Sequence, residues 1–122
     1  MSGINVEVNT WFVEKESDTE AQRYVFAYTI TIENVGDEAG QLLNRHWYVT
    51  DGGGDVQEVQ GPGVVGKQPR IVPGESFRYT SAAVLATPVG SMHGSYEFQR
   101  DNGALFDVPI QAFSLSVPNV VH

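Results

Sequence analysis

Hydrophobic and polar residues alternate with a period of two along most of this chain. The longest alternating run covers residues 24–32 and predicts a β strand with one face against the core. On its apolar side lie Tyr24, Phe26, Tyr28, Ile30 and Ile32. Shorter stretches of the same kind occur at residues 4–13, 42–50, 56–59, 77–83, 92–98, 104–110 and 113–117, separated by turn-forming residues. With no convincing helical pattern, the chain is predicted to form eight or nine short strands in an all-β, antiparallel two-sheet β-sandwich.

Two stretches refine this prediction. Near the N-terminus, Trp11, Phe12 and Val13 break the alternation that begins at Ile4, which predicts a β-bulge or a crossing between sheets. In residues 42–50, the side chains expected on the core face are Leu43, Trp47 and Val49. On the opposite face, His46 is in phase with Tyr48. The motif Asp101, Asn102 and Gly103 predicts a tight hairpin between the strands on either side of it.

Residues 61–66 contain a G-x-G-x-x-G pattern formed by Gly61, Gly63 and Gly66. In dinucleotide-binding proteins this pattern joins a strand to a helix whose N-terminus holds the pyrophosphate. Here Pro69 and Pro73 follow closely, and each lacks an N–H donor and obstructs a helix. The segment is therefore predicted to be an ordered loop between strands, without a dinucleotide site or any other cofactor.

Two uses of this loop stay open at the level of the sequence. Backbone N–H groups of residues 61–66 could form a small-anion site for phosphate or pyrophosphate, with Lys67 and Arg70 supplying positive charge. Alternatively, Val64 and Val65 either plug the end of the core or form a docking surface for a protein partner, together with residues 61–73 and the turn predicted at residues 88–94. The candidate contact residues are Gly61, Gly63, Val64, Val65, Gly66, Lys67 and Arg70.

Composition narrows the classes of function. The 122 residues are expected to form a single domain, 1–122, and the absence of cysteine excludes disulfides and thiolate chemistry. No apolar run is long enough to span a membrane, and the polar start lacks the features of a secretory signal, so a cytoplasmic location is expected. The net charge of -8 disfavours nucleic acids and anionic membranes as partners. The sequence does not indicate an oligomeric state.

The three histidines do not form a recognisable metal-binding motif. His46 and His93 could combine with Asp51 or Asp55, but neither these histidines nor His122 occur at a known ligand spacing. No serine lies in a G-x-S-x-G motif either. We therefore expect no bound metal, no catalytic residues and no enzymatic activity.

Several blocks of the sequence together resemble the ApaG family, from about residue 6 to the C-terminus. These blocks are residues 41–47, 59–69, 73–81, 87–96 and 117–122. The resemblance implies a fibronectin type III or immunoglobulin-like sandwich, in agreement with the strand pattern. It also implies an association with cobalt tolerance and magnesium efflux, and a role in binding proteins, since the domain is found within larger eukaryotic proteins. The family supplies no agreed catalytic residues, and the protein partner is not indicated.

Overall fold

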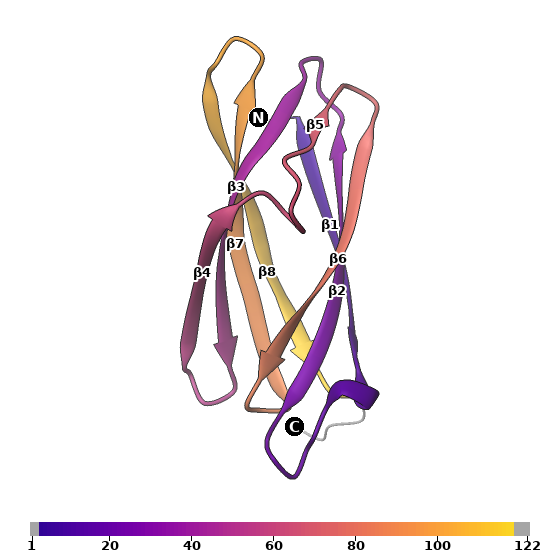
Figure 1. The fold of residues 1–122 in the computed structure, drawn as a ribbon, viewed down its shortest axis with the longest axis vertical. Coiled ribbons are helices and arrows are strands. Elements are labelled where there is room, and N and C mark those ends of the chain that lie inside the picture. The colour runs from indigo at the N-terminus through magenta and orange to yellow at the C-terminus, as the bar shows by residue number, and fades with distance from the viewer. Residues whose placement is uncertain (1–2, 119–122) are drawn as a thin grey trace.

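The computed structural model describes residues 3–118, which form eight β strands and one short 3-10 turn (Figure 1). The strands are β1 (Ile4–Phe12), β2 (Tyr24–Asn34), β3 (Gly40–Asp51), β4 (Val56–Pro62), β5 (Arg70–Ile71), β6 (Ser76–Leu85), β7 (Val89–Arg100) and β8 (Leu105–Ser116). The 3-10 turn, η1 (Glu14–Glu16), lies in the charged connection between β1 and β2. The prediction of an almost entirely β chain is confirmed.

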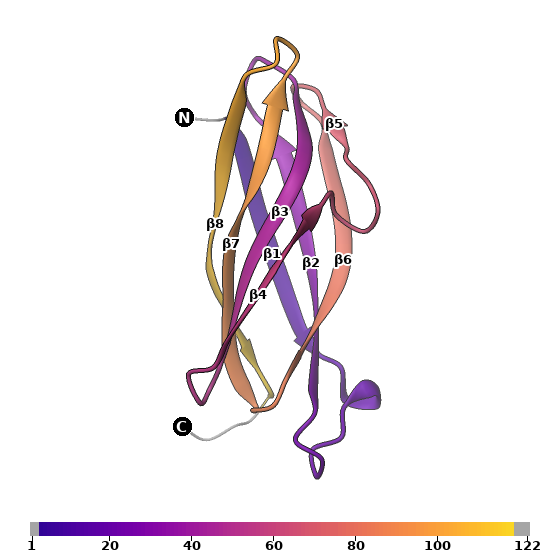
Figure 2. The same ribbon diagram turned by 60° about the vertical axis from the view of Figure 1, so that its left-hand side comes forward.

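The strands form two antiparallel sheets that pack face to face, as the two views in Figures 1 and 2 show. One sheet has the order β1-β2-β6, and the other has the order β4-β3-β7-β8, with β5 paired to the start of β3. The fold is therefore the antiparallel two-sheet sandwich that the alternation predicts, and it is of the fibronectin type III and immunoglobulin kind that the family resemblance implies. The hairpin predicted at residues 101–103 joins β7 to β8, and a second hairpin at residues 51–55 joins β3 to β4.

The core lies between the sheets and takes one side of each alternating strand. Phe26, Tyr28, Ile30 and Ile32 of β2 are buried, as predicted from the longest alternating run. Across from them, β3 and β7 supply the following buried side chains: Leu42, Trp47, Val49, Met92, Tyr96 and Phe98. The aromatic rings meet edge to face, with Trp47 centred 5.8 Å from Tyr28 and 6.1 Å from Tyr96.

The prediction of a bulge or crossing at Trp11 is wrong. The pairing of β1 with β2 runs without a register shift from Ile4 to Phe12. Phe12 stays in phase with Ile4 and packs on Phe26, at 5.5 Å between ring centroids, while Trp11 points to the outer face and is 48% exposed. The irregular pattern arises because a large apolar residue occupies an outward position, which is common on protein surfaces.

Two bulges occur where the sequence pattern is ambiguous. In β3, Leu42 pairs with Phe98 and Asn44 pairs with Glu97, so Leu43 is an extra residue. This bulge places Leu42 rather than Leu43 in the core, which corrects the prediction that Leu43 shares the core face with Trp47.

A second bulge lies between β7 and β8. Met92 pairs with Phe113 and Gly94 pairs with Ile110, so β8 contains one extra residue between its two partners. Ile110 and Phe113 therefore both face the core side although they are three positions apart. What the alternation splits into two strands, at residues 104–110 and 113–117, is one bulged strand, β8.

Candidate functional site

The glycine-rich segment contains a tight turn rather than the start of a helix. After β4 ends at Pro62, Val64 and Lys67 pair as an isolated antiparallel bridge, with N···O distances of 2.8 and 2.9 Å. The two residues between them have positive φ, 44° at Val65 and 79° at Gly66. This geometry is that of a two-residue type I′ hairpin turn. The prediction of an ordered loop rather than a helix start is confirmed for residues 63–66, whereas Gly61 and Pro62 still belong to β4.

Each glycine of the G-x-G-x-x-G pattern has a structural reason in this loop. Gly63 has φ 64°, and a Cβ there would lie 2.4 Å from the Lys67 carbonyl oxygen. Gly66 supplies the positive φ that the second turn position needs. At Gly61 a Cβ would lie 3.0 Å from Nη1 of Arg45, whose guanidinium group covers the bare backbone. The pattern thus encodes a turn and a close approach, with no helix N-terminus for a pyrophosphate.

The two valines of the segment have opposite environments. Val64 is 1% exposed and belongs to the core, whereas Val65 is 54% exposed at the tip of the turn. Val64 therefore acts as the predicted plug, and Val65 is free to contact a partner. Val65 also carries strain, because a β-branched residue strongly disfavours a left-handed backbone conformation.

Most backbone N–H groups of the turn are already bonded within the protein. The Gly63 N–H donates to Leu43, and those of Val64 and Lys67 donate to each other's carbonyl oxygens. Within residues 3–118, the turn N–H groups that donate to no backbone oxygen are those of Val65 and Gly66. An anion site in this loop would therefore depend on two amides.

The two cations assigned to the loop lie in different places. Lys67 is exposed at the turn, but Arg70 begins β5 and binds Asp101 of the β7–β8 hairpin. The Arg70 guanidinium donates from Nε at 3.0 Å and from Nη2 at 2.5 Å to the two carboxylate oxygens. The structure thus separates the predicted pair, and only Lys67 stays beside the glycines.

We expect Arg70→Gln to raise the pKa of Asp101 toward its ordinary value. The hydrogen bonds from Arg70 lower the pKa of this carboxyl, so the ion pair stabilises the fold above the ordinary pKa and is lost as the pH falls through the lowered one. Carboxyl-carbon NMR titration measures the change. Lys67→Gln is the matched control, and a shift of Asp101 in that variant would contradict the arrangement.

The second predicted docking stretch, residues 88–94, is not a turn. Apart from Pro88 it forms the beginning of β7, an inner strand that pairs with β3 on one side and β8 on the other. Its backbone groups therefore take part in two ladders and are unavailable for adding a partner strand. The prediction of a turn over residues 88–94 is wrong because Gly90 and Gly94, which suggest a turn, instead allow close approach of the β3 backbone.

The sandwich is closed along one side and open along the other. β1 lies against β8, whereas β4 and β6 are edge strands that stay apart (Figures 1 and 2). Between these edges lies a groove with two cavities of about 200 and 290 Å³ that share lining residues. Figure 1 shows the loop after β4 crossing the upper part of this open side toward β5. The glycine-rich loop therefore roofs one end of a groove between two unpaired strand edges.

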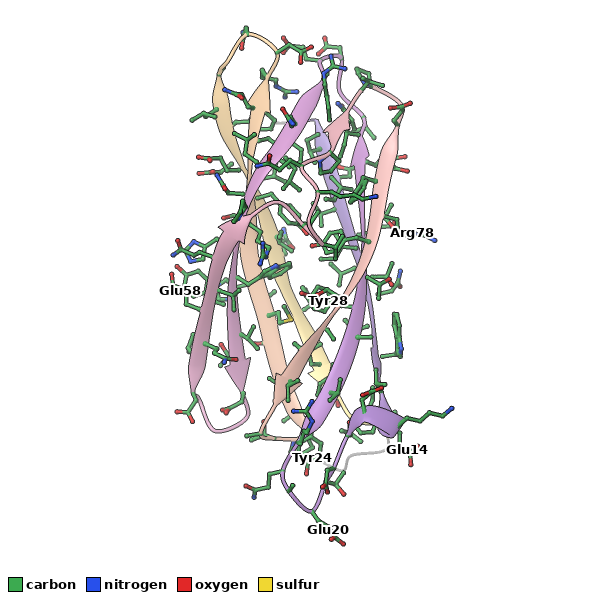
Figure 3. All side chains as sticks on the ribbon, viewed as in Figure 1. Glu14, Glu20, Tyr24, Tyr28, Glu58 and Arg78 are labelled. Atoms are coloured by element: carbon green, nitrogen blue, oxygen red, sulfur yellow. The ribbon has the colours of Figure 1, made fainter. Side chains whose placement is uncertain are left out.

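The roofed end of the groove is polar. Its cavity of about 200 Å³ is lined by Arg45 of β3, Tyr28 of β2, Tyr79 and Ser81 of β6, and the turn at Val65. Burial raises the pKa of Tyr28, partly offset by its hydrogen bond with Ser81 and by the positive charge of Arg45. Figure 3 shows Tyr28 between the sheets, while Glu58 and Arg78 point away from them on opposite outer faces.

The hydroxyl of Tyr79 is bonded to that of Tyr96 in the core next to this cavity. Burial raises the pKa of both phenols, so they stay protonated and neutral at physiological pH. Arg45 is thus the ionised side chain at this end of the groove.

The rest of the groove is more apolar. The cavity of about 290 Å³ shares Tyr28, Arg45, Trp47 and Ser81 with the polar end, and adds apolar lining. The added apolar residues are Val49, Val59, Ala82, Ala83, Val84 and Met92. Val59 and Val84 are 39% and 44% exposed, so large apolar side chains border the groove on both edges.

His46 and His93 lie elsewhere, on the outer face of the β4-β3-β7-β8 sheet. Nε2 of His46 lies 2.5 Å from Glu58, whose carboxylate also accepts a hydrogen bond from Gln60 at 2.9 Å. These contacts lower the pKa of Glu58, with the Gln60 bond as the larger cause. His93 stacks on Tyr48 at 5.0 Å between ring centroids.

The proposed combination of His46 with Asp51 or Asp55 is therefore not formed. Asp51 instead accepts hydrogen bonds from the N–H groups of Gly53 and Asp55 in its own turn. His122, the remaining candidate, lies outside the described residues. Among residues 3–118, no three histidine or carboxylate side chains are grouped as metal ligands.

Arg45 is the residue of this region that the sequence reasoning missed. A signal was present, because Arg45 has the same odd-numbered phase as Trp47 and Val49, the side chains expected on the core face. A charged residue on a core face usually has a structural or functional partner.

Comparison with known proteins gives a consistent result. A sequence profile of the ApaG domain matches residues 14–100. Protein ApaG of Thiobacillus denitrificans is 56% identical over 119 residues, covering 98% of this chain and 94% of that protein, and Protein ApaG of Azoarcus sp. has the same identity and coverage. A crystal structure from Bordetella pertussis, described as an ApaA protein, superposes with a TM-score of 0.93 at 48% identity and covers 96% of this chain and 95% of that one. No helix among the described residues is long and apolar enough to cross a membrane.

Proposed function

This chain belongs to the ApaG domain family, and we propose that it works as a non-enzymatic, cytoplasmic protein-interaction module. The proposed docking site is the open side of the sandwich, where a partner segment lies in the groove between β4 and β6 under the turn at Val65. The observation that carries this proposal is the open groove itself, bordered by two unpaired strand edges and exposed valines. An extended segment would gain main-chain hydrogen bonds at an edge and apolar contacts in the groove.

The strained backbone conformation of Val65 supports the same docking site. Asparagine or glycine would satisfy the left-handed conformation at position 65 without the strain of a valine. Strain kept at an exposed position is typical of sites that serve a function other than stability. Val65 stands at the roofed end of the groove, where an apolar side chain can contact a bound segment.

Substitutions in the groove test the proposal. We expect Val59→Lys combined with Val84→Lys to abolish recovery of the partner in a pull-down from native extract, because two ammonium groups would enter an apolar site. Leu105→Lys is the matched control, since Leu105 is 58% exposed at the start of β8, away from the groove. Thermal unfolding of each variant checks that the substitutions leave the protein folded. Equal recovery by the groove variant and the control would refute docking at this side.

We further propose that the link of the family to cobalt tolerance and magnesium efflux is indirect and depends on this protein partner, not on a cation bound by the chain itself. His46 is engaged by Glu58, and His93 stacks on Tyr48, which supports a structural use of both rings. Repeating the pull-down with added cobalt shows whether the cation changes the complex. Salt-resistant binding of one equivalent of cobalt by the isolated protein, lost in His46→Ala, would contradict an indirect link.

A second candidate function is binding of a small anion at residues 61–66. It is favoured by the amides of Val65 and Gly66 lying beside the exposed Lys67. Calorimetry with inorganic pyrophosphate tests it. Binding that is lost in Lys67→Gln and kept in Arg70→Gln would support this candidate over the first.

A further inference from the structure

We propose that the polar end of the groove is a carboxylate-binding pocket, and that the segment docked there carries an aspartate or glutamate side chain directed at Arg45. This inference deepens the proposed function and rests on it. It assigns a ligand chemistry to Arg45, Tyr28 and Ser81, which lie behind the glycine-rich turn rather than in it.

The guanidinium group of Arg45 has hydrogen-bond donors left for a ligand. Its Nη1 donates to the carbonyl oxygens of Pro62 and Gly63, at 3.0 and 3.1 Å. Within residues 3–118, no protein acceptor binds its Nη2 or Nε, and the ion pairs are His46–Glu58 and Arg70–Asp101. A half-buried guanidinium without a carboxylate is costly unless a ligand supplies the charge. The free Nε and Nη2 together match the two oxygens of a carboxylate.

The surroundings of Arg45 suit a carboxylate as well. Tyr28 and Ser81 line the same cavity of about 200 Å³ and are hydrogen-bonded to each other, which leaves one of their two hydroxyl protons to donate to an anion. Burial raises the pKa values of Tyr28 and Tyr79, and the nearby positive charge of Arg45 lowers both by a smaller amount. The cavity therefore combines positive charge, neutral donors and partial exclusion of water, which together strengthen an ion pair.

The negative charge of the whole chain makes Arg45 the favoured position for the carboxylate of an acidic ligand. With a net charge of -8, most of the surface repels an acidic segment, so such a segment gains by placing its carboxylate at Arg45, near the exposed Lys67. In an extended chain, residues two positions apart lie on one face roughly 7 Å apart. An apolar residue two positions from the acid would then reach the adjoining apolar cavity beside Val59 and Met92.

Selection from a random peptide library displayed on phage tests the ligand chemistry directly. With the wild-type chain we expect enriched peptides to share an aspartate or glutamate followed or preceded, two positions away, by an apolar residue. With Arg45→Gln the acidic position should disappear from the consensus. Arg78→Gln is the matched control, because Arg78 lies on the outer face of β6 and, among residues 3–118, its guanidinium donates to Thr31 Oγ1 alone.

A synthetic form of the enriched peptide measures how much its acidic side chain contributes to the binding affinity. Replacing its acid by glutamine should weaken binding to the wild type about tenfold or more, and should hardly change binding to Arg45→Gln. Tyr28→Phe removes a donor without removing the charge, and should weaken the acidic peptide by a smaller factor. This variant also keeps the test decisive if Arg45→Gln unfolds, which thermal denaturation reports. A peptide that ends in a free carboxylate at the same position distinguishes a C-terminal group from a side chain.

The outcomes separate this inference from the proposed function. Peptides enriched without an acidic position, or with one that survives in Arg45→Gln, would overturn the carboxylate pocket and leave the docking groove standing. No enrichment at all would count against docking. In that case an NMR titration with sodium acetate decides the pocket: shifts at Trp47 and Ser81 in the wild type and not in Arg45→Gln support it, and the absence of such shifts overturns it.

Discussion

Val64→Ser is expected to lower the free energy of unfolding by about 3 kcal/mol, from lost apolar burial and an added hydroxyl in the core. Val64 is 1% exposed and packs with the central cluster between the sheets, so the loop cannot move away without uncovering that cluster. For a chain of this size the change corresponds to a fall in melting temperature of roughly 10 °C. Denaturant unfolding followed by tryptophan fluorescence gives the free energy.

The neighbouring residue provides the matched control. Val65→Asn should raise the free energy of unfolding by about 1 kcal/mol, because asparagine followed by Gly66 favours a type I′ turn. If docking occurs at this turn, the same change should weaken partner binding while stabilising the fold. A destabilised Val65→Asn, or a Val64→Ser as stable as the wild type, would contradict the division of the two valines into plug and contact.

Gly94→Ala is expected to have an equal or larger effect, lowering the free energy of unfolding by about 3 kcal/mol or more. A Cβ at Gly94 would lie 2.0 Å from the His46 carbonyl oxygen and 3.1 Å from the Trp47 Cα, so two backbones would have to separate. The position is the partner of Trp47 and adjoins the bulge between β7 and β8. Because both β3 and β8 pair with β7 here, the strain cannot be relieved at an edge.

Gly53→Ala is the control for this substitution. A Cβ there would meet, among residues 3–118, just the Asp51 side chain, at 3.3 Å, in an exposed turn. We expect a change within about 0.5 kcal/mol, typical of surface positions. Thermal and denaturant unfolding of the two variants side by side measure the difference. Equal stability of both would mean that β7 can shift away from β3 at little cost.

Much of the fold could be predicted from the sequence because the period of a strand is local. The alternation in residues 24–32 places a side chain on one face or the other whatever the rest of the chain does. The hairpin at residues 101–103 and the two-sheet class follow from similarly local rules. The rejection of a dinucleotide site also needed only local information, because proline prevents a helix wherever the chain is placed.

The bulges could not be predicted with the same rules. The extra residue at Leu43 puts Leu42 and Trp47 on the same face although they are five positions apart. A second extra residue, in β8, puts Ile110 and Phe113 on the same face although they are three positions apart. Each bulge is defined by the pairing of two strands distant in the sequence, so the sequence of one strand does not reveal it. Trp11 shows the converse case, where an apolar residue suggested an irregularity that the pairing of β1 does not contain.

For the candidate site, the sequence alone predicted that the glycine-rich segment is a loop rather than a helix start, and it singled out Val64 and Val65 as a plug of the core or a docking surface. Only the tertiary structure decided that Val64 is buried and Val65 exposed, that Arg70 binds Asp101, and that Arg45 faces Tyr28 and Ser81 between the sheets. The physical reason is that backbone conformation depends on neighbouring residues, whereas burial and charge pairing depend on which strands meet. The open groove between β4 and β6 arises from the strand order of two sheets, and no single stretch of the chain encodes it.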